Sequence, residues 1–194
     1  AWAKILQNIE EVIGIWLKVQ STWLYLEPIF SSEDIRKQMP MEAKRFATVD
    51  RTWRDIMQGL QEDSSCISIG KKEGMIDRLE QASKLLDLIQ KGLSDYLNTK
   101  RVFFPRFFFL SNDELLEILS ETKDPKRVLP HLKKCFEGVN SWEFQSDLSI
   151  TSIISKEKEV IPLDYEAISE KTINPNDSGG CVEIWLDQIQ TVMR

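Results

Sequence analysis

Large apolar residues recur at alternating steps of three and four in the first part of the chain, and this spacing constrains the fold more than any other feature. The stripe runs from Trp2 to Leu26, and its period places those residues on one face of an α-helix. At 1.5 Å per residue such a helix is roughly 40 Å long, and Pro28 is expected to end it. A second apolar set predicts that the helix is covered on more than one side: Leu6, Ile13, Leu17 and Leu24.

Later segments share the helical period. Ser31-Ser32-Glu33-Asp34 predicts the start of a short helix, and a further stripe runs from Pro40 to Leu60 before the polar break Glu62-Asp63-Ser64-Ser65. The sequence therefore predicts a mainly α fold, built as an elongated series of antiparallel helical bundles. The most regular stripe has near-heptad steps, which suit a coiled-coil-like seam: Met75, Leu79, Ala82, Leu86, Ile89, Leu93 and Leu97.

The apolar period changes in the last third of the chain. Ile150–Ser155 and Glu159–Leu163 are rich in β-branched residues and flank Lys156-Glu157-Lys158, which predicts one small β-hairpin. Asn174–Gly180 has the composition of a loop, and a final helix is expected from Val182.

Four parts of the chain follow from these patterns. Residues 1–100 are expected to form a long-helix bundle and residues 101–147 short helices and connectors. Residues 148–164 are expected to form the β-hairpin, and residues 165–194 a loop and the start of another helix.

A dense aromatic run, Val102–Leu110, contains Pro105 and is too short for another long helix. Two interpretations stay open for it: a buried connector where helical bundles meet, which is favoured, and a groove that binds a partner. Ser111 and Glu114 follow with the spacing of a capping box, in which each side chain bonds the backbone amide of the other residue.

Charge and cysteine content narrow the function classes. Lys and Arg number 25 against 31 Asp and Glu, a net charge of −6, whereas general nucleic-acid binding favours a basic face. The three cysteines are far apart and form no C-x-x-C pair, so neither a zinc site nor a disulfide framework is expected. No apolar run approaches the roughly 20 residues of a membrane span. No signal peptide is recognised, and helical periodicity at both ends suggests a fragment of a longer chain.

Two glycine-containing segments have part of the pattern of a phosphate or anion site. Gly70-Lys71-Lys72 lacks the earlier glycine and the following hydroxyl of a P-loop, which makes a chance match the favoured interpretation. Gly179-Gly180 precedes a helix and suits either an anion at the helix N-terminus or, as favoured, a flexible entry to that helix.

Side chains that could carry acid–base or metal chemistry are few. His131 is the single histidine, so a structural role is favoured over a triad or zinc site. A basic stretch from Lys123 to Lys134 suits an ordinary solvated face better than a docking face for an acidic protein. No catalytic, cofactor-binding or metal-binding residue is therefore assigned. A group of carboxylates fits helix capping better than acid–base work: Asp113, Glu114, Glu117 and Glu121.

Three stretches resemble the linker region of dynein heavy chains. Val19–Phe30 is similar to the first signature of that region, Pro105–Leu119 to its most recognisable one, and Pro130–Gly138 to a third. The resemblance spans about Val12 to the C-terminal end. Lys100–Phe104 and Ala47–Asp50 resemble axonemal rather than cytoplasmic members, with an inner-arm isoform as the specific hypothesis.

The resemblance implies a mechanical lever that arches over a ring of AAA+ modules. This fragment is then not an enzyme, and ATP and Mg belong to the AAA+ modules of a full chain that works as a microtubule-dependent ATPase. The implied partners are the chain's own AAA+ ring in cis, microtubules through the full chain, and dynein intermediate or light chains or axonemal docking components. No nucleic acid or membrane is implied. The implied location is the cytoskeleton of the cytoplasm, in the axoneme of a cilium or flagellum.

Two local expectations also follow from the resemblance. The hairpin tip, Lys156, Glu157 and Lys158, is the possible ring contact, and a glycine is expected near the tip where this sequence has Lys158. Bending of the lever is expected nearer Asp124–Asn140 than within the helix that carries the Met75–Leu97 stripe. A helical scaffold unrelated to motors is the alternative function, and an enzyme fits least because no nucleophile–base set is present.

Overall fold

Two units make up the chain, residues 1–94 and residues 95–194. They are seen in a computed structural model that describes residues 2–120, 125–163 and 173–193. The first unit contains α1 (Trp2–Ser31), α2 (Glu33–Gln38), α3 (Pro40–Glu62), α4 (Cys66–Lys71) and most of α5 (Met75–Phe103). The second unit contains the end of α5 and the following elements: η1 (Pro105–Phe109), α6 (Asn112–Ser120), η2 (Pro125–Val128), α7 (Leu129–Cys135), β1 (Val139–Phe144), β2 (Ile150–Ser155), β3 (Val160–Pro162), η4 (Pro175–Ser178) and α8 (Val182–Val192).

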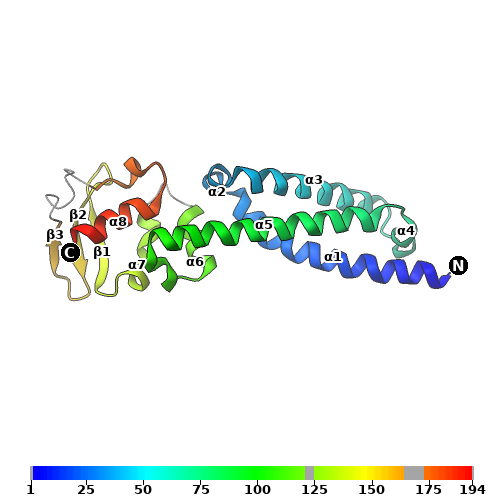
Figure 1. The fold of residues 1–194 in the computed structure, drawn as a ribbon, viewed down its shortest axis with the longest axis horizontal. Helices are drawn as coiled ribbons and strands as arrows, with labels where there is room; N and C mark the ends of the chain where they lie inside the picture. The colour runs from blue at the N-terminus through cyan, green and yellow to red at the C-terminus, as the bar shows by residue number, and fades with distance from the viewer. Residues whose placement is uncertain (1, 121–124, 164–172, 194) are drawn as a thin grey trace. The chain divides into compact units, whose positions relative to one another are not determined.

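The prediction of a mainly α fold with a small antiparallel β element is confirmed. Within the first unit, α1, α3 and α5 lie side by side (Figure 1). Trp16 and Trp23 of α1 contact Trp53 of α3 at ring-centre distances of 5.1 and 6.0 Å, and Phe30 stacks on Phe46 at 5.2 Å. Residue numbers rise along α1 while they fall along α3, so these two helices are antiparallel.

The near-heptad stripe of α5 forms a buried seam, as predicted. All of its members, from Met75 to Leu97, are at most 4% exposed. Arg78 of α5 lies 3.9 Å from Asp55 of α3, and Lys18 of α1 donates to Asp87 of α5 at 3.1 Å. The periodicity therefore identified the core face of this helix correctly, because that face is set by local spacing alone.

Two predictions about α1 are wrong. Pro28 does not end the helix, which continues to Ser31. Proline lacks the amide that would donate to the Leu24 carbonyl, so it removes one backbone hydrogen bond, and only the last turn of the helix follows it. In that turn the Ser31 hydroxyl donates to the Glu27 carbonyl at 2.9 Å. The second apolar set is not covered within the described residues, because Leu6, Ile13, Leu17 and Leu24 are all exposed.

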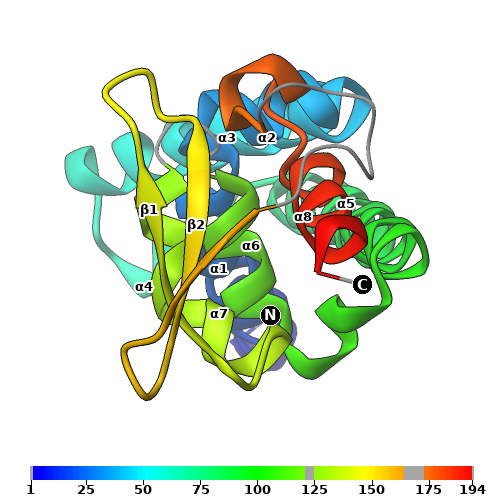
Figure 2. The ribbon, with the colours of Figure 1, turned by 90° about the vertical axis from the view of Figure 1, so that its left-hand side faces the viewer.

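The predicted hairpin is confirmed as β2 and β3, and a strand that the sequence did not suggest completes the sheet. The order is β1-β2-β3, with both pairs antiparallel. Figure 2 shows this sheet with α8 beside it. Trp142 of β1 meets Trp185 of α8 at 5.2 Å between ring centres. Strand β1 lies within residues 101–147, which were expected to hold only short helices and connectors.

The hairpin tip is a three-residue loop in which Lys158 has a left-handed backbone, with φ +66°. The Lys158 amide donates to the Ser155 carbonyl at 3.1 Å, and the Ser155 amide donates to the Glu159 carbonyl at 2.9 Å. This pattern is a turn followed by a bulge, whose left-handed position favours glycine. The structure thus explains why a glycine is expected at the position of Lys158.

The aromatic run divides between interior and surface, so the favoured interpretation of a wholly buried connector is wrong in part. Phe104, Phe107 and Leu110 are buried. Within the 3-10 helix η1, the three-residue period carries Phe107 to the core and turns Phe108 and Phe109 outward. Val102 and Phe103 belong to the last turn of α5 and are exposed there. The exposed members are Val102, Phe103, Phe108 and Phe109.

Candidate functional site

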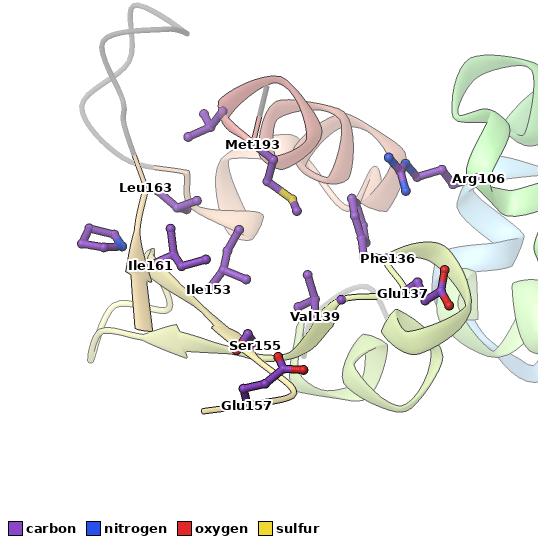
Figure 3. Close-up of a pocket in the computed structure, with 13 residues that line it drawn as sticks. Arg106, Phe136, Glu137, Val139, Ile153, Ser155, Glu157, Ile161, Leu163 and Met193 are labelled. Carbon is purple, nitrogen blue, oxygen red and sulfur yellow. The ribbon is translucent and has the colours of Figure 1, made fainter. Parts of the chain in front are cut away.

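A cavity of about 510 Å³ opens beside the sheet of the second unit (Figure 3). Its polar groups stand at the edge, with Arg106 and Glu137 toward one end and Glu157 of the hairpin tip toward another. An apolar pocket with few polar groups suits an apolar side chain or a small ligand better than acid–base chemistry. The apolar lining comes from all three strands or their ends and from the end of α8: Phe136, Val139, Ile153, Ile161, Leu163 and Met193.

Arg106, which lines the edge of this cavity, connects its own 3-10 helix η1 to α7 and α8. Its Nε donates to Oε1 of Gln190 on α8 at 2.6 Å, and its Nη1 donates to the carbonyl of Cys135 at the end of α7 at 2.7 Å. The guanidinium also lies 4.7 Å from the centre of the Phe136 ring, within the range of a cation–π contact. Arg106 is therefore an internal brace of the second unit.

The second and third signature stretches are brought together by a further contact. Nζ of Lys134 donates to Oε1 of Glu114 at 2.6 Å. The predicted capping box is confirmed, with the Ser111 amide donating to Glu114 at 3.0 Å and the Glu114 amide donating to the Ser111 hydroxyl at 3.3 Å. The Lys134 ammonium, followed by the Ser111 amide, lowers the pKa of Glu114 to about 2.

The first signature stretch packs in the core of the first unit. Val19, Leu26 and Phe30 of α1 are fully or almost fully buried. The Trp23 indole donates to Oδ1 of Asp50 on α3 at 3.1 Å, so a residue of the Ala47–Asp50 segment anchors α1. All three signature stretches therefore supply packing contacts within their units.

A buried ion pair joins the end of α5 to the first turn of α8. Lys100 and Glu183 form it, and their side chains are 12% and 8% exposed. Lys100 also lies 5.3 Å from the centre of the Tyr96 ring. Burial, followed by the charge of Glu183, raises the pKa of the Tyr96 hydroxyl, which therefore stays protonated.

Gly70, of the segment Gly70-Lys71-Lys72, has a packing role. A Cβ at this position would lie 2.4 Å from Cγ1 of Ile9, so glycine lets α4 approach α1 closely. Asn8 of α1 also donates to the Gly70 carbonyl at 3.4 Å. The segment does not have the arrangement of a P-loop.

The remaining sequence candidates do not converge on one site. His131 is buried, with Nε2 3.3 Å from Oε2 of Glu117. Glu121 and Lys123 lie outside the described residues. Gly179 and Gly180 have φ of +61° and +86°, so the turn before α8 accounts for both. No group of His, Cys, Asp or Glu in the described parts of the chain could hold a metal ion.

The cysteines are free thiols with different surroundings. Cys66 is exposed, Cys135 is buried and Cys181 is partly exposed. Burial raises the pKa of the Cys135 thiol to about 11, which keeps it protonated and a poor nucleophile. Among the described helices, none combines the length and apolar character that crossing a bilayer requires.

Sequence reasoning missed Arg106 and the Lys100–Glu183 pair. Both depend on contacts between residues 83 or 84 positions apart, which no local period reveals. An arginine inside an aromatic run was the one available signal, since a charge there needs partners. The hairpin-tip residues Lys156, Glu157 and Lys158 are all exposed.

Comparisons with known proteins cover the whole chain. Residues 1–194 match the family model described as dynein heavy chain, N-terminal region 2. Dynein axonemal heavy chain 3 of Mus musculus is 53% identical over 192 residues, which are 99% of this chain and 5% of that protein. Dynein axonemal heavy chain 12 of Rattus norvegicus is 52% identical over 193 residues, 100% of this chain and 6% of that protein.

A third relative, dynein axonemal heavy chain 1 of Rattus norvegicus, is 48% identical over 194 residues, 100% of this chain and 4% of that protein. The chain thus spans only about one twentieth of the length of these relatives. The family match covers residues 1–194 and therefore includes the helices, the sheet and the signature stretches described above. The chain belongs to the dynein heavy chain family, within its N-terminal region 2.

Proposed function

We propose that residues 1–194 are a linker segment of an axonemal dynein heavy chain, a mechanical lever without chemistry of its own. In this proposal, ATP and Mg are bound by AAA+ modules elsewhere in the full chain, and microtubules are contacted through the full chain. Intermediate and light chains or axonemal docking components are the further partners. The proposed place of action is the axoneme of a cilium or flagellum, which agrees with the axonemal names of the relatives.

The buried seam of α5 is the observation that carries this proposal. A lever must resist bending, and α5 is 29 residues long with one face buried from Met75 to Leu97. The aromatic contacts between α1 and α3 add a second line of packing in the same unit. Packed interiors deform little, so a bundle of this kind transmits displacement along its helices.

Weakening the seam in a full heavy chain tests the proposal. Leu86 is 1% exposed and Leu88 is 49% exposed on the same helix, so Leu86→Ala and Leu88→Ala are a matched pair. Leu86→Ala removes buried packing and should lower the free energy of unfolding by about 2–5 kcal/mol. We expect a lower ratio of microtubule gliding velocity to ATP hydrolysis rate. Leu88→Ala should leave this ratio unchanged. Equal ratios for both variants would contradict the lever role.

The hairpin tip is proposed to touch the AAA+ ring in one nucleotide state. Lys156, Glu157 and Lys158 are exposed and lie in a turn closed by two backbone hydrogen bonds. Reversing the charge with Lys156→Glu and Lys158→Glu should change gliding velocity more than folding stability. Lys133→Glu, an exposed position on α7 in the same unit, is the control. Unchanged velocity in the tip variants would count against the contact.

The bending point is proposed to lie nearer Asp124–Asn140 than within α5. Structures of the heavy chain in two nucleotide states would test this, and bending confined to α5 would contradict it. The alternative of a helical scaffold unrelated to motors does not survive the family assignment.

A further inference from the structure

A narrow stripe of large apolar side chains on α1 is left exposed by the rest of the first unit. At about 100° per residue its members lie within an arc of about 60° around the helix axis. The stripe extends about 33 Å along α1, counted at 1.5 Å per residue. It consists of these side chains, with their exposed fractions: Trp2 64%, Leu6 61%, Ile13 48%, Leu17 60% and Leu24 57%.

The stripe lies on a different side of α1 from the core face. The buried residues Val12, Val19 and Leu26 lie roughly 100–150° away around the helix. The spacing of the stripe repeats every 11 residues, which is close to three turns of an α-helix. The stripe therefore runs almost straight along the surface. Large apolar side chains exposed together along one line of a helix indicate an interaction site.

We propose that this α1 stripe binds an amphipathic α-helix from a part of the same heavy chain outside residues 1–194. The proposal rests on membership of the dynein heavy chain family and not on the lever role. Its first support is geometric, because a straight row of side chains on one helix fits the groove of another helix.

A helix fits the stripe better than other occupants. An extended strand laid on a helix would leave its own backbone amides and carbonyls without partners, whereas a helix satisfies its own. A membrane surface favours a broad apolar face bordered by many basic residues. Lys4 and Lys18 are the basic residues of α1, and Glu10, Glu11 and Glu27 outnumber them.

The rest of the heavy chain is the source that the sequence comparisons favour. The relatives are about twenty times longer than this chain, so most of each polypeptide lies outside the matched region. A helix in the same polypeptide has a high effective concentration near α1 and needs no association step. An intramolecular helix therefore covers the stripe more readily than a second copy or another protein does.

Photo-crosslinking in the full-length heavy chain tests this proposal. Benzoylphenylalanine is placed at Leu17 or, in a second variant, at Leu24, and crosslinked peptides are identified by mass spectrometry. Both variants should capture peptides of one heavy-chain helix outside residues 1–194. The two captured sites should differ by about seven residues, the spacing of the probes on α1. The same probe at Glu11, exposed on the far side of α1, is the control and should not capture that helix.

Each other outcome overturns the proposal. Heavy chains labelled with light and heavy isotopes are mixed, so capture between labels reports a second copy. Capture of another polypeptide, capture within residues 1–194, or equal capture from Glu11 also contradicts it. The absence of any crosslink in folded variants at both Leu17 and Leu24 contradicts it as well. None of these readouts involves motility, so a failure here is distinct from a failure of the lever role.

Discussion

The Lys100–Glu183 pair offers a quantitative test of how the second unit is held together. Both side chains are almost fully buried, at 12% and 8% exposure, so water screens their charges little. The other carboxylate oxygen of Glu183, Oε2, is also buried and has no hydrogen-bond partner within the described residues. Lys100 therefore offsets only part of the hydration that the Glu183 carboxylate loses on folding.

Removing one partner should be costly, whereas removing both should not. Glu183→Gln leaves the Lys100 ammonium buried without a counter-charge, and Lys100→Met leaves the Glu183 carboxylate in the same condition. Each single variant should lose about 3–5 kcal/mol of unfolding free energy. The double variant Lys100→Met with Glu183→Leu removes both charges, and we expect it within about 1 kcal/mol of the parent chain, or above it.

Urea denaturation, combined with amide hydrogen exchange across residues 95–194, measures these differences in the unit that holds the pair. Glu80→Gln provides the surface control, since Glu80 pairs with Lys84 at 46% and 74% exposure; both residues lie in the first unit, so urea denaturation and hydrogen exchange across residues 1–94 measure this change. That change should cost less than about 1 kcal/mol. The reasoning fails if a single buried variant costs no more than this control, or if the double variant loses the sum of both single changes.

Three further predictions concern separate positions. Gly14→Ala should stabilise the first unit by about 0.5–1 kcal/mol, because nothing lies within 4 Å of the added Cβ. Gly70→Ala should destabilise the same unit by about 1–3 kcal/mol, because the added Cβ overpacks the contact with Ile9. Thermal unfolding compares the two variants, and equal shifts in Tm would contradict the close packing of α4 on α1. Lys158→Gly should stabilise the second unit by about 1 kcal/mol, because φ is +66° there, and a lowered urea midpoint would contradict the bulge. The pKa of Glu114 is lowered to about 2 by Lys134, so the ionised carboxylate should contribute fully to folding stability above about pH 4.5 and lose this contribution as the pH falls to about 2. Urea midpoints for the parent chain and Glu114→Gln should therefore converge at low pH, and a difference that stays constant with pH would contradict the lowered pKa.

Sequence reasoning succeeded where a local pattern decides the outcome. The α5 seam and the β2–β3 hairpin follow from spacing and β-branched content within short windows, and the Ser111–Glu114 cap follows from two residue types three positions apart. It failed where tertiary contacts decide. The sequence around Leu17 indicates an apolar face of the helix but does not indicate whether another element covers this face. The sequence around Phe108 indicates a buried aromatic segment but does not indicate the 3-10 turn that points the Phe108 side chain outward.

The same limit explains what was missed at the candidate site. Strand β1 has little alternation of its own, and its pairing with β2 and the contact of Trp142 with Trp185 hold it in the sheet. The cavity beside the sheet exists only because residues from Arg106 to Met193 are assembled around it. Its presence could not be predicted before those segments were placed.

The contacts of Arg106 have a consequence for the order in which the second unit folds during synthesis. Its partners are the Cys135 carbonyl, 29 positions along the chain, and Gln190, 84 positions along. Contacts between distant positions form slowly because a long loop must close first. The first-unit contact of Trp23 with Asp50 closes a loop of only 27 positions. The helices of the first unit can therefore assemble on a nascent chain while the second unit still lacks α8, and the brace at Arg106 forms only after Gln190 has left the ribosome.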